Sequence, residues 1–288
     1  MKKILFKLTL LAISLMVVAS ACSGSSSDKL KVTVSIPPQK YMLEQIAGDK
    51  VDIVTLMDAG SNPETYNPSV STIVGLHQSE IYFTVGTLPF EQKLAQEGEL
   101  NIVDTSKGVK LIHGTHGDCD ASHHHDHGDS DPHIWSSVPN VKIMARNMTD
   151  ALCQADEANA DYYLANLKTF EAKLDSLDGA YRTRLGDTDH KAFVIFHPSL
   201  SYLARDYGLE QIAVGQEGKE STINAQRERI EHAREHSAKV MFVQQEFDSR
   251  QASTVASEIG VNTVTINPMN ANWLGEMEKV VNALTDNE

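Results

Sequence analysis

The chain has 288 residues, a formal net charge of -14 at pH 7, and a hydrophobic fraction of 41%. This length is sufficient for two domains with ordinary cores. The chain is acidic and lacks runs of basic residues, so nucleic-acid binding is not expected, and its charge instead favours attraction of cations.

The first residues have the composition of an export signal. After a basic start, Leu8 to Val18 is mostly apolar and too short to span a membrane. Residues 1–21 are therefore predicted to be a signal peptide. The sequence Ala19-Ser20-Ala21-Cys22 resembles a bacterial lipobox, which predicts a lipidated Cys22 and a tether over residues 22–29. The alternative is cleavage at the same point without lipidation.

Strand and helix patterns alternate along the rest of the chain. In chain order we expect strands over 30–36, 51–57, 80–85, near 102, 192–196, 211–214, 240–244 and 263–266, with helices between them. This alternation predicts parallel sheets with helices on both faces.

A long helix is predicted between the two groups of strands. Apolar residues recur at helical spacing after Glu157, and the segment to Leu185 would span roughly 40 Å, which suits a rigid rod. The predicted fold is α/β, with two parallel-sheet lobes joined by one long helix. The expected parts are an N-terminal lobe over 30–153, the linking helix over 154–187 and a C-terminal lobe over 188–288.

A His-rich loop over 113–131 interrupts the N-terminal lobe. Its histidines are accompanied by aspartates, and a short tract of this kind indicates metal binding, because imidazole suits zinc, copper and nickel. The tract histidines are His113, His116, His123, His124, His125 and His127. The alternative is an acidic loop without a metal role.

Polar residues also follow several predicted strands. Ligands of parallel α/β sheets bind beyond the carboxyl ends of the strands. Glu64, His133, His197, Glu246 and Asn267 occupy such positions, divided between the two lobes. We therefore expect a cleft between the lobes to bring them together.

Several short motifs follow one another in a specific order. After the lipobox come Gly60 to Pro68, the His-rich loop, Pro132 to Trp135, Asp156 to Tyr163, and His197 to Gly208. This pattern resembles the zinc/manganese solute-binding lipoproteins of bacterial ABC importers. The resemblance implies a metal receptor without enzymatic activity, which serves an ABC permease and its ATPase outside the cytoplasm. It also implies a lipid anchor in the membrane, and we expect a monomer.

The resemblance also implies a ligand set. The family's first ligand histidine falls on Glu64, a departure that keeps a competent oxygen donor, and the next two fall on His133 and His197. The family's last ligand, an aspartate, falls on the neutral Asn267. Glu246 could supply the missing carboxylate, although the family's usual glutamate position holds Gln244. Two imidazoles and the His-rich loop favour Zn²⁺ over Mn²⁺, and the loop is expected to sample metal and pass it inward.

Other interpretations remain open at this point. The chain could be an exported zinc-dependent hydrolase, or a surface metal buffer or adhesin. His232 to His236 matches an inverted zinc-peptidase motif, but its helix is rich in charge, which predicts a solvated face with Ile230 and Ala233 inward. His77 and His190 are interpreted as structural. A Cys119–Cys153 disulfide is possible in an exported protein.

Overall fold

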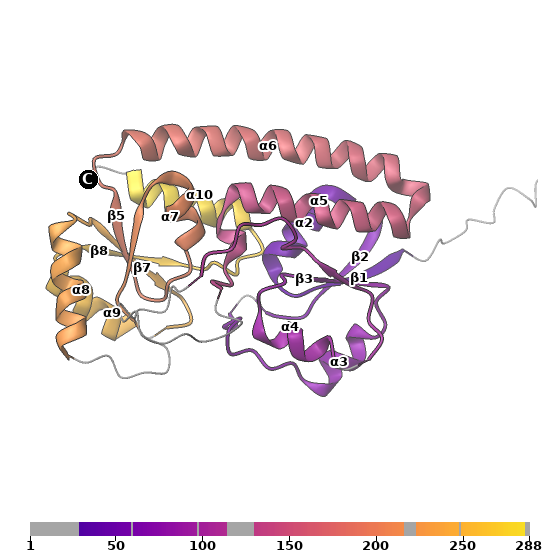
Figure 1. Cartoon of the computed structure of the whole chain (residues 1–288), viewed down its shortest axis with the longest axis horizontal. Helices are drawn as coiled ribbons and strands as arrows, with labels where there is room; N and C mark the ends of the chain where they lie inside the picture. Colours follow the sequence, from indigo (N-terminus) through magenta and orange to yellow (C-terminus); the bar gives the residue numbers. More distant parts are fainter. Residues whose placement is uncertain are drawn as a thin grey trace, which may run out of the picture.

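The structure is a computed structural model that describes residues 29–58, 60–96, 98–113, 130–215, 223–247 and 249–285. It has two lobes, each built on a parallel four-stranded sheet, and a long helix that runs along both (Figure 1). This confirms the fold predicted from the sequence. The signal peptide, Cys22, and all of the tract histidines except His113 lie outside the described residues.

The N-terminal lobe contains β1 to β4 in the order β2-β1-β3-β4. The strands are β1 (Leu30–Val34), β2 (Val51–Thr55), β3 (Ile81–Thr84) and β4 (Ile102–Asp104), with helices α2 (Pro37–Ala47), α3 (Val70–Leu76) and α4 (Pro89–Leu94). β1 ends two residues sooner than expected. The amides of Ser35 and Ile36 donate to the side-chain oxygen of Gln39, the third residue of α2.

The C-terminal lobe repeats the same topology, with the order β6-β5-β7-β8. Its strands are β5 (Ala192–Ile195), β6 (Glu210–Ala213), β7 (Val240–Gln244) and β8 (Asn262–Ile266), and its helices are α7 (Ser201–Tyr207), α8 (Ile223–Glu235), α9 (Ser249–Ile259) and α10 (Trp273–Thr285). The strand order reverses direction between β5 and β7. Ligands of open parallel sheets bind at such a switch point, beyond the carboxyl ends of the strands.

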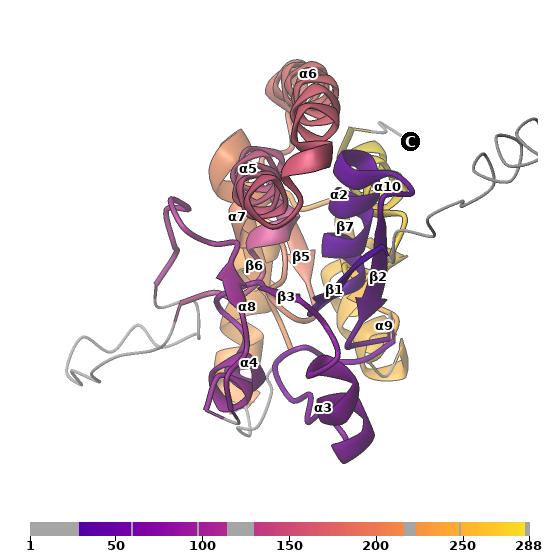
Figure 2. The same cartoon turned by 90° about the vertical axis from the view of Figure 1, so that its right-hand side faces the viewer.

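Helices α5 (Val138–Ala155) and α6 (Ala160–Asp187) connect the lobes, with a 3₁₀ turn, η2 (Glu157–Asn159), between them. At 1.5 Å per residue α6 spans roughly 42 Å. It packs against α2 and α5 of the first lobe and against α7 and α10 of the second (Figures 1 and 2). Its buried residues are Tyr163, Phe170, Leu174, Tyr181 and Leu185. Among the described helices, none is both long enough and apolar enough to cross a membrane.

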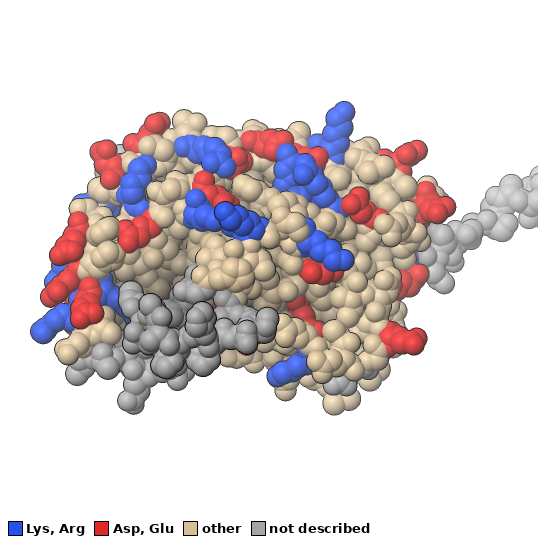
Figure 3. Space-filling model, in the orientation of Figure 1, with Lys and Arg blue, Asp and Glu red and all other residues tan. Residues whose placement is uncertain are grey.

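The exposed face of α5 and α6 carries charges of both signs side by side (Figure 3). Lys142 pairs with Asp175 at 2.5 Å, and Arg146 pairs with Glu171 at 2.5 Å, both from α5 to α6. Exposed pairs of this kind stabilise by about 0–1 kcal/mol each. These pairs therefore contribute little stability beside the burial of the apolar face of α6.

One apolar core continues from lobe to lobe. It includes Val34 and Trp135 of the first lobe and Ile195 and Val280 of the second, with Leu174 of α6. A second core, between α8, α9 and the outer face of the C-terminal sheet, belongs to that lobe alone. A shared core and a shared helix therefore join the two lobes, in keeping with the rigid rod predicted from the sequence.

Candidate metal centre

Glu64 lies in the loop between β2 and α3. Its amide donates to the side chain of Asn62 at 2.8 Å, and the hydroxyl of Tyr66 holds the loop by donating to the carbonyl oxygen of Leu56. The Glu64 side chain is 16% exposed. The loop therefore presents the carboxylate toward the space between the lobes without burying it fully.

His133 immediately precedes the 3₁₀ turn η1 (Ile134–Ser136). Its amide and its Nδ1 both lie within hydrogen-bond distance of Asp131 Oδ1, at 2.9 and 3.0 Å. A carboxylate on one ring nitrogen fixes the ring orientation and leaves Nε2 free to bind a metal. Asp131 is thus a positioning residue, a role that no motif in the sequence indicates.

Asp131 is itself held from the second lobe. The hydroxyl of Tyr202 donates to the carbonyl oxygen of Asp131 at 2.7 Å. Burial alone would raise the pKa of the Asp131 carboxyl, but its hydrogen bonds and its interaction with His133 hold the pKa below the usual range. The carboxylate is therefore charged where it supports His133.

His197 follows β5 at the switch point of the C-terminal sheet. The buried side chain of Gln244 makes two hydrogen bonds to the backbone of His197. Its oxygen accepts from the His197 N–H at 3.3 Å, and its nitrogen donates to the His197 carbonyl oxygen at 2.5 Å. The ring of Phe247 stacks on the imidazole, with centroids 5.5 Å apart. Gln244, a departure from the family pattern, therefore positions His197.

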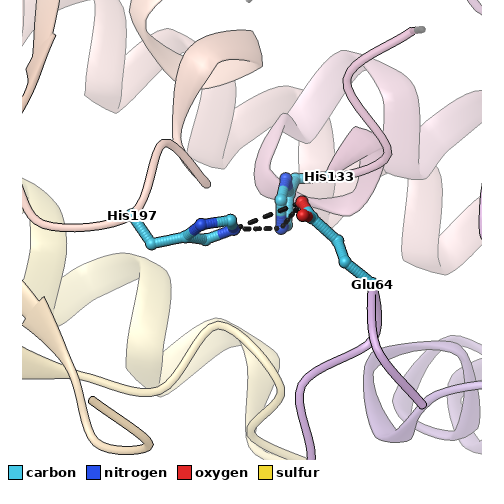
Figure 4. A group of neighbouring side chains, drawn as sticks. All are labelled: Glu64, His133 and His197. Carbon is cyan, nitrogen blue, oxygen red and sulfur yellow. Dashed lines mark hydrogen bonds and ion pairs between the residues drawn. The ribbon is translucent and has the colours of Figure 1, made fainter. Parts of the chain in front are cut away.

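The three side chains converge between the lobes (Figure 4). His133 Nε2 and His197 Nε2 lie 3.3 Å apart, and Glu64 Oε1 lies 3.3 Å from His197 Nε2 and 3.7 Å from His133 Nε2. Ligands at about 2.0–2.1 Å from a tetrahedral zinc ion lie about 3.3–3.4 Å from one another. The donors are therefore spaced as a single ion would require.

The two candidates for a fourth ligand differ in position. Glu246 lines a small cavity together with His133, His197 and Met269. Asn267 uses its side-chain oxygen to accept from the amide of Met269 at 3.0 Å, which caps the turn after β8. Among the described acidic and imidazole side chains, the donor cluster of Glu64, His133 and His197 does not include Glu246.

The remaining histidines and cysteines have other surroundings. His113 is exposed and forms an isolated antiparallel bridge with Ser130. Cys119 lies outside the described residues, and Cys153 has a free thiol that donates to the carbonyl oxygen of Ala160. Among the described residues, neither His77 nor His190 belongs to a metal-binding cluster.

The chain has two parallel-sheet lobes, and two imidazoles and a carboxylate meet between them. This arrangement is that of a metal-binding solute receptor. The chain belongs to the ZnuA family, described as the periplasmic component A of zinc-uptake complexes, whose family model matches residues 32–287. Members of this family are receptors for ABC import and not enzymes, which excludes the hydrolase interpretation.

Individual relatives resemble the chain over most of its length. The zinc-uptake protein ZnuA of Bacillus subtilis is 29% identical, covering 90% of this chain and 87% of the relative. The zinc-binding lipoprotein AdcA of Streptococcus pneumoniae is 28% identical, and the match covers 62% of its length. The solved structure of a ZnuA deletion mutant with zinc bound is 32% identical with a TM-score of 0.80, covering 91% of this chain and 100% of that one.

Proposed function

We propose that this protein captures Zn²⁺ between its lobes, with Glu64, His133 and His197 as ligands, and delivers the ion to an ABC permease driven by its ATPase. The observation that carries the proposal is the convergence of three donor atoms from both lobes at 3.3, 3.3 and 3.7 Å. Because the ion would bridge the lobes, its capture and release are coupled to their relative position.

Zinc is favoured over manganese by the donors themselves. Two neutral imidazoles and a carboxylate at near-tetrahedral spacing suit Zn²⁺, whereas Mn²⁺ prefers oxygen donors. The zinc-binding ZnuA and AdcA relatives point the same way. Manganese remains the alternative cargo, since Glu64 and Glu246 together would offer two carboxylates.

The lipid anchor is part of the same proposal. Lipidation of Cys22 would keep the receptor beside its permease outside the cytoplasm, and the similarity to the lipoprotein AdcA supports this arrangement. Metabolic labelling with a fatty acid, compared between the wild type and Cys22→Ser, tests it. Equal labelling of the two chains would refute the anchor.

Calorimetric titration of the metal-stripped protein tests the cargo. We expect one tight Zn²⁺ site, weaker Mn²⁺ binding, and loss of the tight site in Glu64→Ala. Glu44→Ala is the matched control, because Glu44 is half exposed on α2, where it pairs with Lys40 across 3.7 Å. A tight Zn²⁺ site that survives Glu64→Ala, or tighter binding of Mn²⁺ than of Zn²⁺, would contradict the proposal.

The fourth ligand requires its own variant. Glu246→Gln retains the size of the side chain but replaces a good zinc ligand with a poor one. If Glu246 completes the site, Zn²⁺ affinity falls in this variant while the stoichiometry of tight binding remains one. An unchanged affinity would remove Glu246 from the ligand set and leave that position to Asn267 or water.

A further inference from the structure

A second cluster of one glutamate and two histidines lies on the C-terminal lobe, away from the interlobe site. His232 lies in the last turn of α8 and His236 directly follows the helix, so the two share one helical face. Glu210, the first residue of β6, reaches both, with Oε1 2.7 Å from His232 Nε2 and Oε2 2.5 Å from His236 Nδ1. The two imidazole rings lie 4.1 Å apart.

The sheet separates this cluster from the interlobe site. Glu210 pairs with Ala192 at the amino end of β5, whereas His197 follows the carboxyl end of the same strand. The four residues of β5 alone span roughly 13 Å, so one ion cannot serve both clusters. Figure 1 shows α8 at the end of the molecule away from the N-terminal lobe.

The histidine pair is fixed by the packing of α8. Ile230 is 6% exposed and Ala233 is fully buried against the outer face of the sheet, as the sequence predicted. That register turns the other helix face outward, and the side chains of His232, His236 and Glu210 are 45%, 43% and 41% exposed. The donors are thus held in place and open to solvent.

Two nearby cations are directed elsewhere. Arg234, between the two histidines, donates to the carbonyl oxygen of Glu258 on α9. Lys191 precedes β5 and accepts the Glu210 amide on its carbonyl, and its ammonium donates to the carbonyls of Leu185 and Gly186 at 2.7 and 3.0 Å. Neither Arg234 nor Lys191 therefore places its positive charge on the carboxylate and imidazoles of the cluster.

We propose that Glu210, His232 and His236 form a second, surface site for a divalent transition-metal ion of the zinc, nickel or copper type. The two imidazole rings lie 4.1 Å apart and both face the same carboxylate, so one divalent ion can be shared by all three side chains. The ligand atoms already lie within 4.8 Å of one another, and small side-chain rotations bring them to about 3.3–3.4 Å around zinc. Solvent fills the remaining coordination positions.

Hydrogen–deuterium exchange of the full-length, metal-stripped protein with added Zn²⁺ tests this site. An ion at the cluster ties the end of α8 to β6, so exchange of the segment 229–238 slows by about tenfold when free Zn²⁺ exceeds the dissociation constant about tenfold. His232→Ala/His236→Ala and Glu210→Gln remove this protection and lower the Zn²⁺ stoichiometry in equilibrium dialysis by one. His77→Ala/His190→Ala, which removes two histidines outside both clusters, keeps the protection and that site.

The interlobe site is separated from this result by its own variant. In Glu64→Ala the protection of α8 persists, so failure of either site is visible without the other. The proposal is overturned if millimolar Zn²⁺ leaves α8 exchange unchanged in the wild type. It is equally overturned if protection survives in His232→Ala/His236→Ala.

Discussion

The two clusters carry the same donors, one glutamate and two histidines, in opposite surroundings. The interlobe side chains of Glu64, His133 and His197 are 16%, 4% and 8% exposed, whereas those of the α8 cluster are all above 40% exposed. Electrostatic interactions are several times stronger in a poorly hydrated site than at the surface. The comparison predicts that burial, and not the inventory of donors, separates a capture site from a weak one.

Support around the donors differs as well. In the interlobe site Asp131 contacts the ring of His133, and Gln244 holds the backbone of His197 by hydrogen bonds, so both histidines are positioned by neighbouring residues. In the α8 cluster, among the described residues, the side chains of His232 and His236 contact Glu210 and each other. Preorganised ligands lose less freedom when an ion binds, which adds to the effect of burial.

The largest expected effect is the loss of a histidine from the interlobe site, compared with the loss of one from the α8 cluster. His197→Ala is expected to weaken the tightest Zn²⁺ affinity by more than about 100-fold, beyond what removal of an outer contact costs. His232→Ala should change that affinity by less than about twofold, since it touches only the surface cluster. Competition titration against a zinc-sensitive dye measures both. Similar losses in the two variants would abolish the distinction between the clusters.

The next effect isolates positioning from ligation. Asp131→Asn retains the shape of the side chain and an acceptor for the His133 amide, but removes the charge behind the ring. We expect Zn²⁺ affinity to fall by about tenfold with unchanged stoichiometry. Asp175→Asn, on the exposed face of α6, is the control. A loss of stoichiometry in Asp131→Asn would instead identify Asp131 as a ligand.

The sequence predicted the fold well because the patterns involved are local. The strand Val240–Gln244 falls where expected, and the helices Pro37–Ala47 and Ser249–Ile259 lie between strands as expected, since alternation and helical spacing depend on near neighbours. Glu64, His133 and His197 were predicted from their places after strands together with the family resemblance. Their convergence in the structure agrees with that prediction, and their role as ligands stays a proposal.

The parts that the sequence could not predict depend on contacts distant along the chain. His232 and His236 are visible as a helical pair, but Glu210 joins them only because β6 forms the sheet edge beside α8. Tyr202 supports the backbone of Asp131 across 71 positions. Local spacing in the sequence does not indicate contacts over such distances. The place of Glu210 in the α8 cluster and the support of Asp131 by Tyr202 are therefore visible only in the fold.

A smaller effect is expected from restoring the charge at position 267. Asn267→Asp keeps the oxygen that caps the Met269 amide and places a carboxylate beside the cavity that Met269 lines. Through Coulomb attraction we expect Zn²⁺ affinity to rise by up to about tenfold. Asn262→Asp adds the same charge at the other, exposed end of β8 and should leave affinity unchanged. Equal gains would assign the effect to net charge and not to position.

The smallest effect on affinity is expected from the His-rich tract. His113, its described member, is exposed, and its bridge to Ser130 closes the loop directly before Asp131. His113 is thus tied to the segment that carries His133, but among the described residues the interlobe donor cluster does not include His113. Replacing His113, His116, His123, His124, His125 and His127 by Asn should leave the tightest affinity within about twofold. The total Zn²⁺ stoichiometry and the loading rate in stopped-flow mixing should both fall, because a surface pool of imidazoles raises the local ion concentration. Loss of the tightest site in this variant would move the capture site into the loop and reverse the comparison between buried and exposed donors.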